Sequence, residues 1–197
     1  MPLSKQPKEI AFTRTAVRQV AGLAAGERAA LRDALRRYAA DPAALAGQSA
    51  ALRTAPVSRL AVGAKRLMLV EGEERIVVLK VGDSGSDNGL TLLRDLATGR
   101  EERVAEDTLD RLLAGEHPVK VWREFRGLTQ AVLAKRAGIN AHYLSQIETG
   151  TRHASDEVLA DLQHALGIDA LDFGLLVDLP GRGKKRRRSK PHPRGAG

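Results

Sequence analysis

The segment RGLTQAVLAKRAGINAHYLSQIETG, residues 126–150, constrains the fold of this 197-residue chain more than any other stretch. Apolar residues recur in it at the spacing of two short helices, and Gly138 lies between them, where a tight turn calls for a positive φ. Asn140 is a good N-cap for the second helix, and Thr149 followed by Gly150 is a typical helix end. The sequence therefore predicts two short helices packed together across a glycine turn.

This pair of helices has the spacing of a helix-turn-helix, which needs a small residue where the helices touch and apolar residues that fix the second helix. Six positions fit that spacing: Gln130, Ala134, Gly138, Ile139, Leu144 and Ile147. Apolar residues before and after the pair predict an all-α domain of about five short helices over residues 118–180. The LTQ…LA…GI…YLSQIE…G pattern is similar to XRE-family (Cro/repressor-like) DNA-binding domains over residues 119–173.

The XRE resemblance implies a double-stranded DNA operator as partner and a homodimer on inverted half-sites about 34 Å apart. The second helix then lies in the major groove, with its N-terminal side chains at base edges. The implied base contacts are Ala141, His142, Tyr143, Ser145 and Gln146, and the implied phosphate contacts are Thr129, Gln130 and Arg152. Gln146 suits adenine, and Ala141 suits the methyl group of thymine. Two alternatives stay open: Tyr143 packs in the core, and His153 either holds a phosphate or contacts nothing.

The charge of the chain is unevenly distributed, although its net value is +8. Residues 118–180 hold 6 Lys+Arg and 8 Asp+Glu, so the predicted DNA-binding domain is slightly acidic. Residues 181–197 hold 8 cations and no acid, and their Pro and Gly content predicts a disordered basic tail. Phosphate contacts expected from the tail are Lys184, Lys185, Arg186, Arg187 and Arg188. The alternative is a basic terminus without function.

The first 88 residues have a different pattern. The letters KEIAF predict a strand, Thr13 is placed to cap a helix, and a second amphipathic helix follows, ending at Asp41. From Pro56 onward the apolar period changes to two, with breaks at Gly63 and Gly72 that suit hairpins. We therefore expect an α+β domain with two helices on a small antiparallel sheet.

This order, with AADPAAL and RLAVGAKRLMLVEGEERIVVLKVG, resembles the RelE/ParE toxin superfamily over about residues 8–84. RelE-type members cut messenger RNA on the ribosome, and the resemblance implies Arg59 and Arg66 as the candidate catalytic cations. Two positions depart from the family pattern, because Ala61 stands where a second basic residue is common and Lys65 where an aromatic often sits. The alternative is that Arg59 and Arg66 are solvated strand residues.

The stretch LKVGDSGSDNG, residues 79–89, stands where active relatives present their last catalytic side chains. Residues 1–88 contain no histidine, and their one tyrosine, Tyr38, lies on the core-facing side of a predicted helix. A proton relay is therefore missing, and we expect a degenerate toxin-like domain rather than an enzyme. The alternatives are a ribosome-dependent mRNA endoribonuclease inhibited in cis by its antitoxin, and gyrase poisoning as in ParE-type relatives.

Residues 89–117 are acidic, with 4 Lys+Arg and 7 Asp+Glu, beside a first block that holds 14 and 9. Leucines recur at helical spacing, so the segment is expected to be a helical linker or to dock on the basic first domain. It also resembles the region that precedes the DNA-binding unit in helix-turn-helix antitoxins.

Composition excludes several classes of function. The chain has no cysteine, which removes disulfides and thiolate metal sites, and its histidines show no metal-ligand spacing, so we expect no metal and no cofactor. No run approaches the roughly 18 apolar residues of a membrane span, so we expect a cytoplasmic protein. Together the patterns predict a fusion that acts as a transcriptional regulator, an autorepressor of toxin–antitoxin type.

Overall fold

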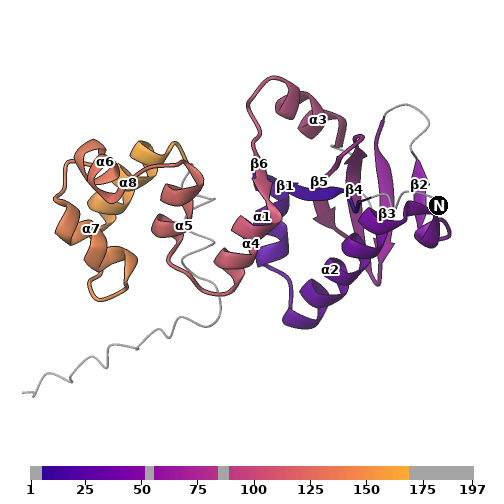
Figure 1. Ribbon diagram of the computed structural model, residues 1–197, viewed down its shortest axis with the longest axis horizontal. Coiled ribbons are helices and arrows are strands. Elements are labelled where there is room, and N and C mark those ends of the chain that lie inside the picture. Colours follow the sequence, from indigo (N-terminus) through magenta and orange to yellow (C-terminus); the bar gives the residue numbers. More distant parts are fainter. Residues whose placement is uncertain (1–5, 52–55, 84–88, 169–197) are drawn as a thin grey trace, which may run out of the picture.

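The computed structural model describes residues 6–51, 56–83 and 89–168 of the chain. Figure 1 shows two units in this part: a sheet unit, residues 6–113, and a helical unit, residues 118–168. Of the stretch LKVGDSGSDNG, expected to stand where active toxins present their last catalytic side chains, residues 84–88 lie outside the described residues. The fold accordingly joins a mixed α/β layer to a small helical bundle.

The elements begin where local sequence signals favour them. The Thr13 hydroxyl accepts a hydrogen bond from the Ala16 N–H at 3.0 Å and so caps the first helix, as expected. In chain order the sheet unit contains β1 Glu9–Thr13, α1 Arg14–Ala21, α2 Ala25–Ala40, the 3-10 turn η1 Pro42–Leu45, β2 Ser49–Ala51, β3 Ser58–Val62, β4 Lys65–Glu71, β5 Arg75–Gly82, α3 Gly89–Ala97, β6 Arg103–Ala105 and α4 Glu106–Leu113. The helical unit contains α5 Pro118–Phe125, α6 Gln130–Arg136, α7 Ala141–Glu148 and α8 Asp156–Leu166.

The six-stranded sheet has the order β2-β3-β4-β5-β1-β6. The expected hairpins are present in β3, β4 and β5, which pair antiparallel. The prediction of a purely antiparallel sheet is wrong, because β1 runs parallel to β5, with Ile10 opposite Ile76. The reason is the crossover through α1 and α2, which carries the chain from β1 across one face of the sheet to its far edge. The strand that later pairs with β1 is therefore not joined to it by a hairpin, and it can run parallel to β1.

The acidic segment that follows β5 is part of the sheet unit. Its strand β6 pairs antiparallel with β1 at the sheet edge, where Val104 is fully buried. Helix α4 lies beside α2, with ion pairs from Arg32 to Asp110 and from Arg36 to Glu106. The structure thus differs from a helical linker: residues 89–113 add a strand and two helices to the sheet unit, and residues 114–117 alone lead to α5.

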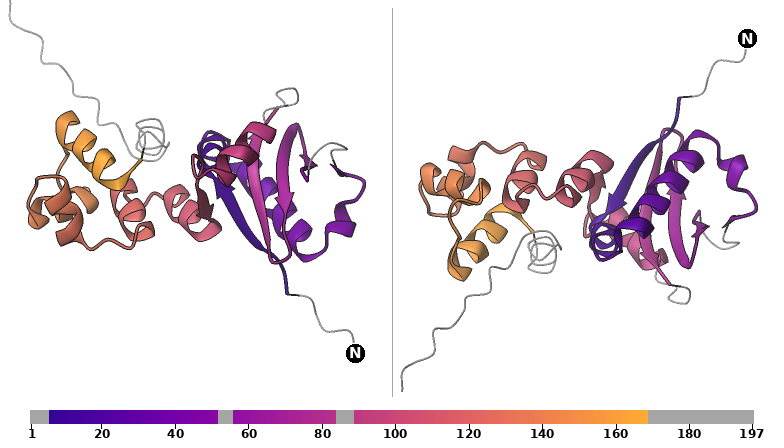
Figure 2. Two further views of the ribbon diagram at one scale, coloured as in Figure 1. Left: turned by 90° about the horizontal axis from the view of Figure 1, so that it is seen from above. Right: turned by 90° about the horizontal axis from the view of Figure 1, so that it is seen from below.

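Two apolar layers cover the two faces of the sheet. Helices α1, α2 and α4 lie on one face, and α3 lies on the other (Figure 2). Tyr38 is buried in the larger layer, as its helical position predicts, and Met68 and Leu92 belong to the smaller layer under α3. The larger layer continues through α4 into the helical unit, where it includes Trp122. No described helix is long and apolar enough to cross a membrane.

Candidate nucleic-acid interface

Helices α6 and α7 are built by local capping. The Thr129 hydroxyl accepts the Val132 N–H at the start of α6, and the Asn140 side chain accepts the Tyr143 N–H at 2.7 Å at the start of α7. Such caps satisfy backbone donors that have no partner inside the helix. The Asn140 cap fixes where the second helix begins, and the chain leaves it at Thr149, as the sequence indicates.

The turn between the two helices requires glycine. Gly138 has φ +67°, and the next residue, Ile139, donates its N–H to the Ala134 carbonyl at 3.0 Å. A side chain at Gly138 would be strained at this φ. Ala134 is buried between the helices, and Leu144 anchors α7 with its side chain fully buried. The expected packing of the helix pair is confirmed.

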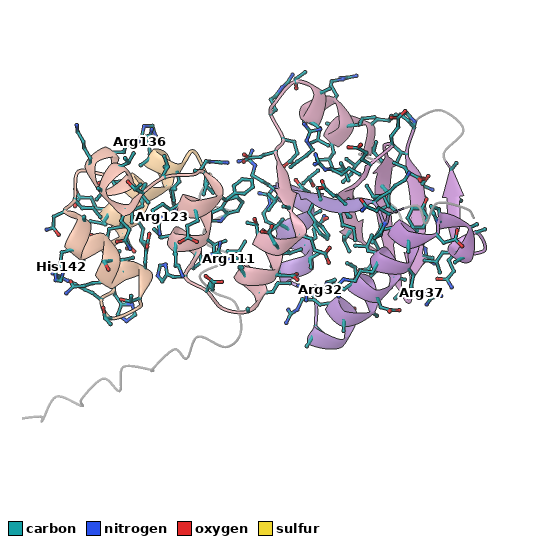
Figure 3. All side chains as sticks on the ribbon, viewed as in Figure 1. Arg32, Arg37, Arg111, Arg123, Arg136 and His142 are labelled. Carbon is teal, nitrogen blue, oxygen red and sulfur yellow. The ribbon has the colours of Figure 1, made fainter. Side chains whose placement is uncertain are left out.

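The predicted base contacts lie together on one side of α7. Ala141 and His142 are exposed, while Ser145 and Gln146 are half-buried. Figure 3 shows His142 at the outer side of this helix. Its ring nitrogen Nε2 lies 3.1 Å from the Gln146 amide nitrogen. This face can therefore present an amide, an imidazole and a hydroxyl to a ligand.

Tyr143 packs against the core, the alternative to a base contact that the sequence left open. Its ring is half-buried and packs against the core, and its hydroxyl donates to the His153 carbonyl at 3.4 Å. The Arg152 guanidinium lies 4.4 Å from the centre of the Tyr143 ring, a cation–π contact. This contact holds an exposed cation next to the N-terminal half of α7.

The two phosphate contacts expected at the start of α6 differ in whether their side chains are available to a ligand. Thr129 is exposed, whereas the Gln130 amide turns inward and donates to Glu148 Oε2 at 2.8 Å. The Gln130 side chain is therefore engaged within the domain, and its backbone N–H is the group left at the helix start. Lys184, Lys185, Arg186, Arg187 and Arg188 lie outside the described residues.

A buried ion pair that the sequence analysis missed holds the helix pair to α5. Glu148 ends α7 with a side chain only 2% exposed, and it accepts hydrogen bonds from Arg123 Nε at 2.6 Å and Nη2 at 3.0 Å. Arg123 also donates to the Leu128 carbonyl at 2.8 Å. The sequence does contain a signal of this buried pair. Arg123 follows Val119 by four residues and Glu148 follows Leu144 by four, so both charges fall on buried helical faces.

This pair continues into a network that reaches the sheet unit. Glu124 accepts from Arg123 at 3.1 Å and from Arg111 of α4 at 2.5 Å, and Arg111 also donates to Glu116 at 2.8 Å. Hydrogen bonds from Arg111 lower the pKa of Glu116 to about 2, and the same arginine lowers the pKa of Glu124. Figure 3 shows Arg111 and Arg123 on this path. Acidic and basic groups therefore tie α4 to α5.

A second contact joins the units near β6. The Arg126 guanidinium binds Glu102, with Nη2 to Oε2 at 2.8 Å, and it donates from Nε to the Leu166 carbonyl at 2.9 Å. The same group lies 5.9 Å from the centre of the Trp122 ring and 5.3 Å from that of Phe125. One arginine thus fixes α8, α5 and the loop before β6 to each other.

The candidate catalytic cations lie on the sheet face under α3. Arg59 stands opposite Met68, and Arg66 stands opposite Ala61, so alternation along the strands puts both arginines on the same face. Both are exposed, and Arg66 donates to two carbonyls of the adjoining hairpin turn. Tyr38 belongs to the opposite face and donates to Glu71 at 3.4 Å. The sheet separates the tyrosine from the two arginines.

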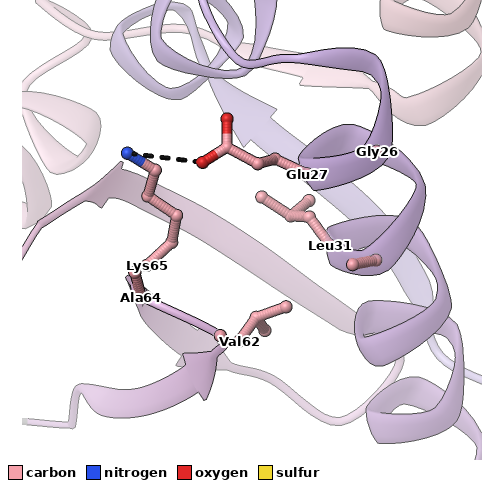
Figure 4. A pocket seen from close by; sticks show the side chains of 8 residues that line it. Gly26, Glu27, Leu31, Val62, Ala64 and Lys65 are labelled. Atoms are coloured by element: carbon pink, nitrogen blue, oxygen red, sulfur yellow. Dashed lines mark ion pairs between the residues drawn. The ribbon is translucent and has the colours of Figure 1, made fainter.

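A small cavity lies between the start of α2 and the β3–β4 turn (Figure 4). It has a volume of about 230 Å³ and is lined by Gly26, Glu27, Ala30, Leu31, Val62, Gly63, Ala64 and Lys65. Its mouth carries an ion pair between Lys65 and Glu27 at 3.7 Å. Ligand pockets usually have about 300–1,000 Å³, so this space is small for a regulatory ligand. Within the described residues no group of His, Asp and Glu could hold a metal ion.

Two capped helices crossing at a glycine turn, with the polar side of the second one exposed, define a helix-turn-helix domain, the class that binds DNA. Residues 119–173 match the family model of a helix-turn-helix domain. No curated protein shows a significant match to the chain. The chain therefore carries a helix-turn-helix domain next to a mixed-sheet unit, an arrangement that indicates a DNA-binding regulator.

Proposed function

We propose that the protein is a sequence-specific transcriptional repressor of the XRE type that acts on its own promoter as part of a toxin–antitoxin system. The observation that carries this proposal is one face of α7, which brings together Ala141, His142, Ser145 and Gln146, with the Arg152 cation held over the Tyr143 ring of the same helix. Side chains of these types read base edges when a helix occupies the major groove. The partner is double-stranded DNA, bound by a homodimer.

Phosphate attraction has two sources in this proposal, the end of α6 within the helical domain and the basic tail beyond it. Lys135 and Arg136 end α6 with exposed side chains, and the tail of residues 181–197 adds 8 cations. Backbone contacts position a protein on the duplex, and base contacts specify the sequence. The tail therefore raises affinity for all DNA, and α7 selects the operator.

The test is selection of bound fragments by the full chain from the source genome and from random duplexes, repeated with Gln146→Ala. We expect the wild type to enrich one inverted motif, and Gln146→Ala to lose about 1–3 kcal/mol of discrimination at one base pair in each half-site. His164→Ala, an exposed change on α8, is the matched control and should keep the motif. Failure of the wild type to enrich any motif would contradict the proposal.

The sheet unit is, in this proposal, a toxin-like domain without catalysis that serves as a dimerisation surface. The separation of Arg59 and Arg66 from Tyr38 by the sheet supports it, because cleavage through the ribose 2′-hydroxyl needs proton transfer beside the cations. Cross-linking or light scattering of the full chain would detect the dimer, and the helical unit alone would give the monomer.

A ribosome-dependent endoribonuclease held inactive in cis is the second candidate. The ion pairs of α2 with α4, through Arg32 and Arg36, favour it, because they hold the acidic segment of residues 89–113 on the basic first block, residues 1–88. A tethered inhibitor works at an effective concentration of about mM. Expression of residues 1–88 alone is a poor test, since it removes β6 and the buried Val104. Expression of residues 1–116 keeps the sheet complete and, with and without Arg66→Ala, tests whether messenger RNA is cleaved. DNA damage with intact messenger RNA would indicate gyrase poisoning.

A further inference from the structure

Two neighbouring carboxylates in the loop before β6 bind different units of the protein. Glu101 accepts hydrogen bonds at the start of α1, from the Arg14 backbone N–H at 2.8 Å and from the Thr15 hydroxyl at 2.9 Å. Glu102 accepts instead from both Nη atoms of Arg126 at the end of α5, with Oε2 2.8 Å from Nη2. Two parallel hydrogen bonds between a guanidinium and a carboxylate fix direction as well as distance. The loop therefore attaches the end of α5 to the start of α1.

A second bridge joins α4 to α5, which lie next to each other between the two units (Figure 1). Arg111 of α4 donates from Nη2 to Glu124 Oε2 of α5 at 2.5 Å and from Nε to Glu116 Oε1 at 2.9 Å. The backbone N–H of Glu116 in turn donates to the Arg111 carbonyl at 3.1 Å. The connection between the units is therefore bonded to the end of α4.

The two bridges hold α5 from different sides. Glu124 and Arg126 are two residues apart in helical backbone, so their side chains leave the helix roughly 200° apart around its axis. Leu112 of α4 and Trp122 of α5 also belong to one buried apolar layer. These contacts oppose both rotation of α5 about its own axis and movement of α5 away from α4.

Helix α5 in turn holds α7. Arg123 of α5 and Glu148 at the end of α7 form the buried ion pair, with Nε and Oε1 2.6 Å apart. Arg123 also donates to Glu124 at 3.1 Å, so the bridge to α4 and the pair with α7 meet at one arginine. The contacts of α5 therefore fix how α7 is oriented relative to the sheet unit.

We propose that Glu102 and Glu124 are positioning residues that hold α7 at one orientation to the sheet unit and thereby set the spacing of the two operator half-sites. The inference rests on the proposed function, because it takes the sheet unit as the dimerisation surface. In such a dimer each α7 is placed by the path from the sheet unit through α5. Dimers of this class bind half-sites one helical turn apart or multiples of it, so the distance between the two α7 helices decides which operators fit. The acidic segment then acts as a rigid connection between the units.

Both carboxylates can be removed without loss of the fold. The side chains of Glu102 and Glu124 are 33% and 36% exposed, and ion pairs of such exposure contribute little to stability. Arg126 keeps its bond to the carbonyl at the end of α8, and Arg123 keeps its pair with Glu148. Loss of the two bridges should therefore change the orientation of the helical unit and leave its folding intact.

The experiment is selection by the full chain from random duplexes long enough to hold two half-sites at any spacing. We expect the wild type to enrich its half-site at one spacing. The alanine pair Glu102→Ala, Glu124→Ala should keep the half-site sequence, while its preference for that spacing over neighbouring ones falls at least about fivefold, the lower limit of typical couplings between sites. The glutamine pair Glu102→Gln, Glu124→Gln keeps an oxygen acceptor opposite each arginine and should lose less of the preference.

The matched control is Glu9→Ala, Glu157→Ala, which also removes one exposed carboxylate from each unit. Glu9 pairs with Arg75 within the sheet, and Glu157 is exposed in the first turn of α8. This control should keep both the half-site sequence and the spacing of the wild type.

The outcomes separate the inference from the function beneath it. An alanine pair with the spacing preference of the wild type overturns the positioning role and leaves the repressor proposal intact. A changed half-site sequence in the alanine pair, or a loss of spacing preference in the control, also overturns it, because the effect would then come from α7 itself or from net charge. Absence of any motif with the wild type overturns the repressor proposal itself.

Residual dipolar couplings of the free full chain test the rigid attachment without DNA. In the wild type a single alignment tensor should fit the amides of both units. In the alanine pair the helical unit should need a tensor different from that of the sheet unit. Two different tensors in the wild type, or one shared tensor in the alanine pair, would overturn the inference whatever the selection shows.

Discussion

Substitution of Glu148 by alanine should destabilise the helical unit strongly. Glu148 accepts three hydrogen bonds, two from Arg123 and one from Gln130, and the side chains of the ion pair are 9% and 2% exposed. Removal of one member of a buried pair leaves the other charge without compensation, at about 3–5 kcal/mol. Arg123 keeps its bonds to the Leu128 carbonyl and to Glu124, so we expect the lower end, about 3 kcal/mol.

The free energy of unfolding can be measured by urea titration followed through Trp122 fluorescence. Trp122 is the only tryptophan of the chain and is fully buried in the helical unit, so its emission reports on this unit. Glu124→Ala is the matched control, because it removes an exposed carboxylate from the same Arg123 and should cost at most about 1 kcal/mol. The double variant Arg123→Met, Glu148→Leu should recover most of the loss, since an apolar pair leaves no buried charge.

Two results would refute this reasoning. If Glu148→Ala cost no more than Glu124→Ala, the pair would contribute no more than a surface contact. If the double variant were as unstable as Glu148→Ala, the loss would come from packing of the helix end rather than from the unpaired charge of Arg123.

Further predictions concern stability in acid and the binding of DNA. Glu116→Gln should flatten the loss of stability in acid: the pKa of Glu116 is lowered from 4.5 to about 2, so its contribution is complete above pH 4.5 and disappears as the pH falls to 2. Because its side chain is 34% exposed, solvent screening reduces this contribution to about 1 kcal/mol, which acid titration of both forms by circular dichroism would detect. Removal of residues 181–197 should weaken binding to all duplexes alike, as measured by fluorescence anisotropy. It should also flatten the slope of log affinity against log salt concentration, which is about −4.5 when ~5 phosphates are neutralised. A changed binding motif would show instead that the tail selects sequence. Arg152→Ala should weaken binding to operator and unrelated duplex equally, whereas Tyr143→Leu should also lower the affinity for the operator relative to other sequences, because it removes an aromatic ring from α7.

Local sequence determined most of the helix-turn-helix. The Asn140 cap, the positive φ of Gly138 and the burial of Ala134 and Leu144 depend on interactions within a few residues, and each is where the spacing predicts it. The strands β3 to β5 were predictable for the same reason, since hairpins pair neighbours along the chain.

Long-range pairing decided the rest. The parallel contact of β1 with β5 joins residues 66 positions apart, as in Glu9 and Arg75, and β6 joins β1 from a segment whose composition indicates only charge and helix. The Arg123–Glu148 pair spans 25 positions, and neither residue type is usually found inside a protein. The sequence by itself determined which helices form and which of their faces are apolar. Only the tertiary structure decided which distant strands pair with β1 and which opposite charge pairs with the buried Arg123. Burial depends on what the rest of the chain brings into contact.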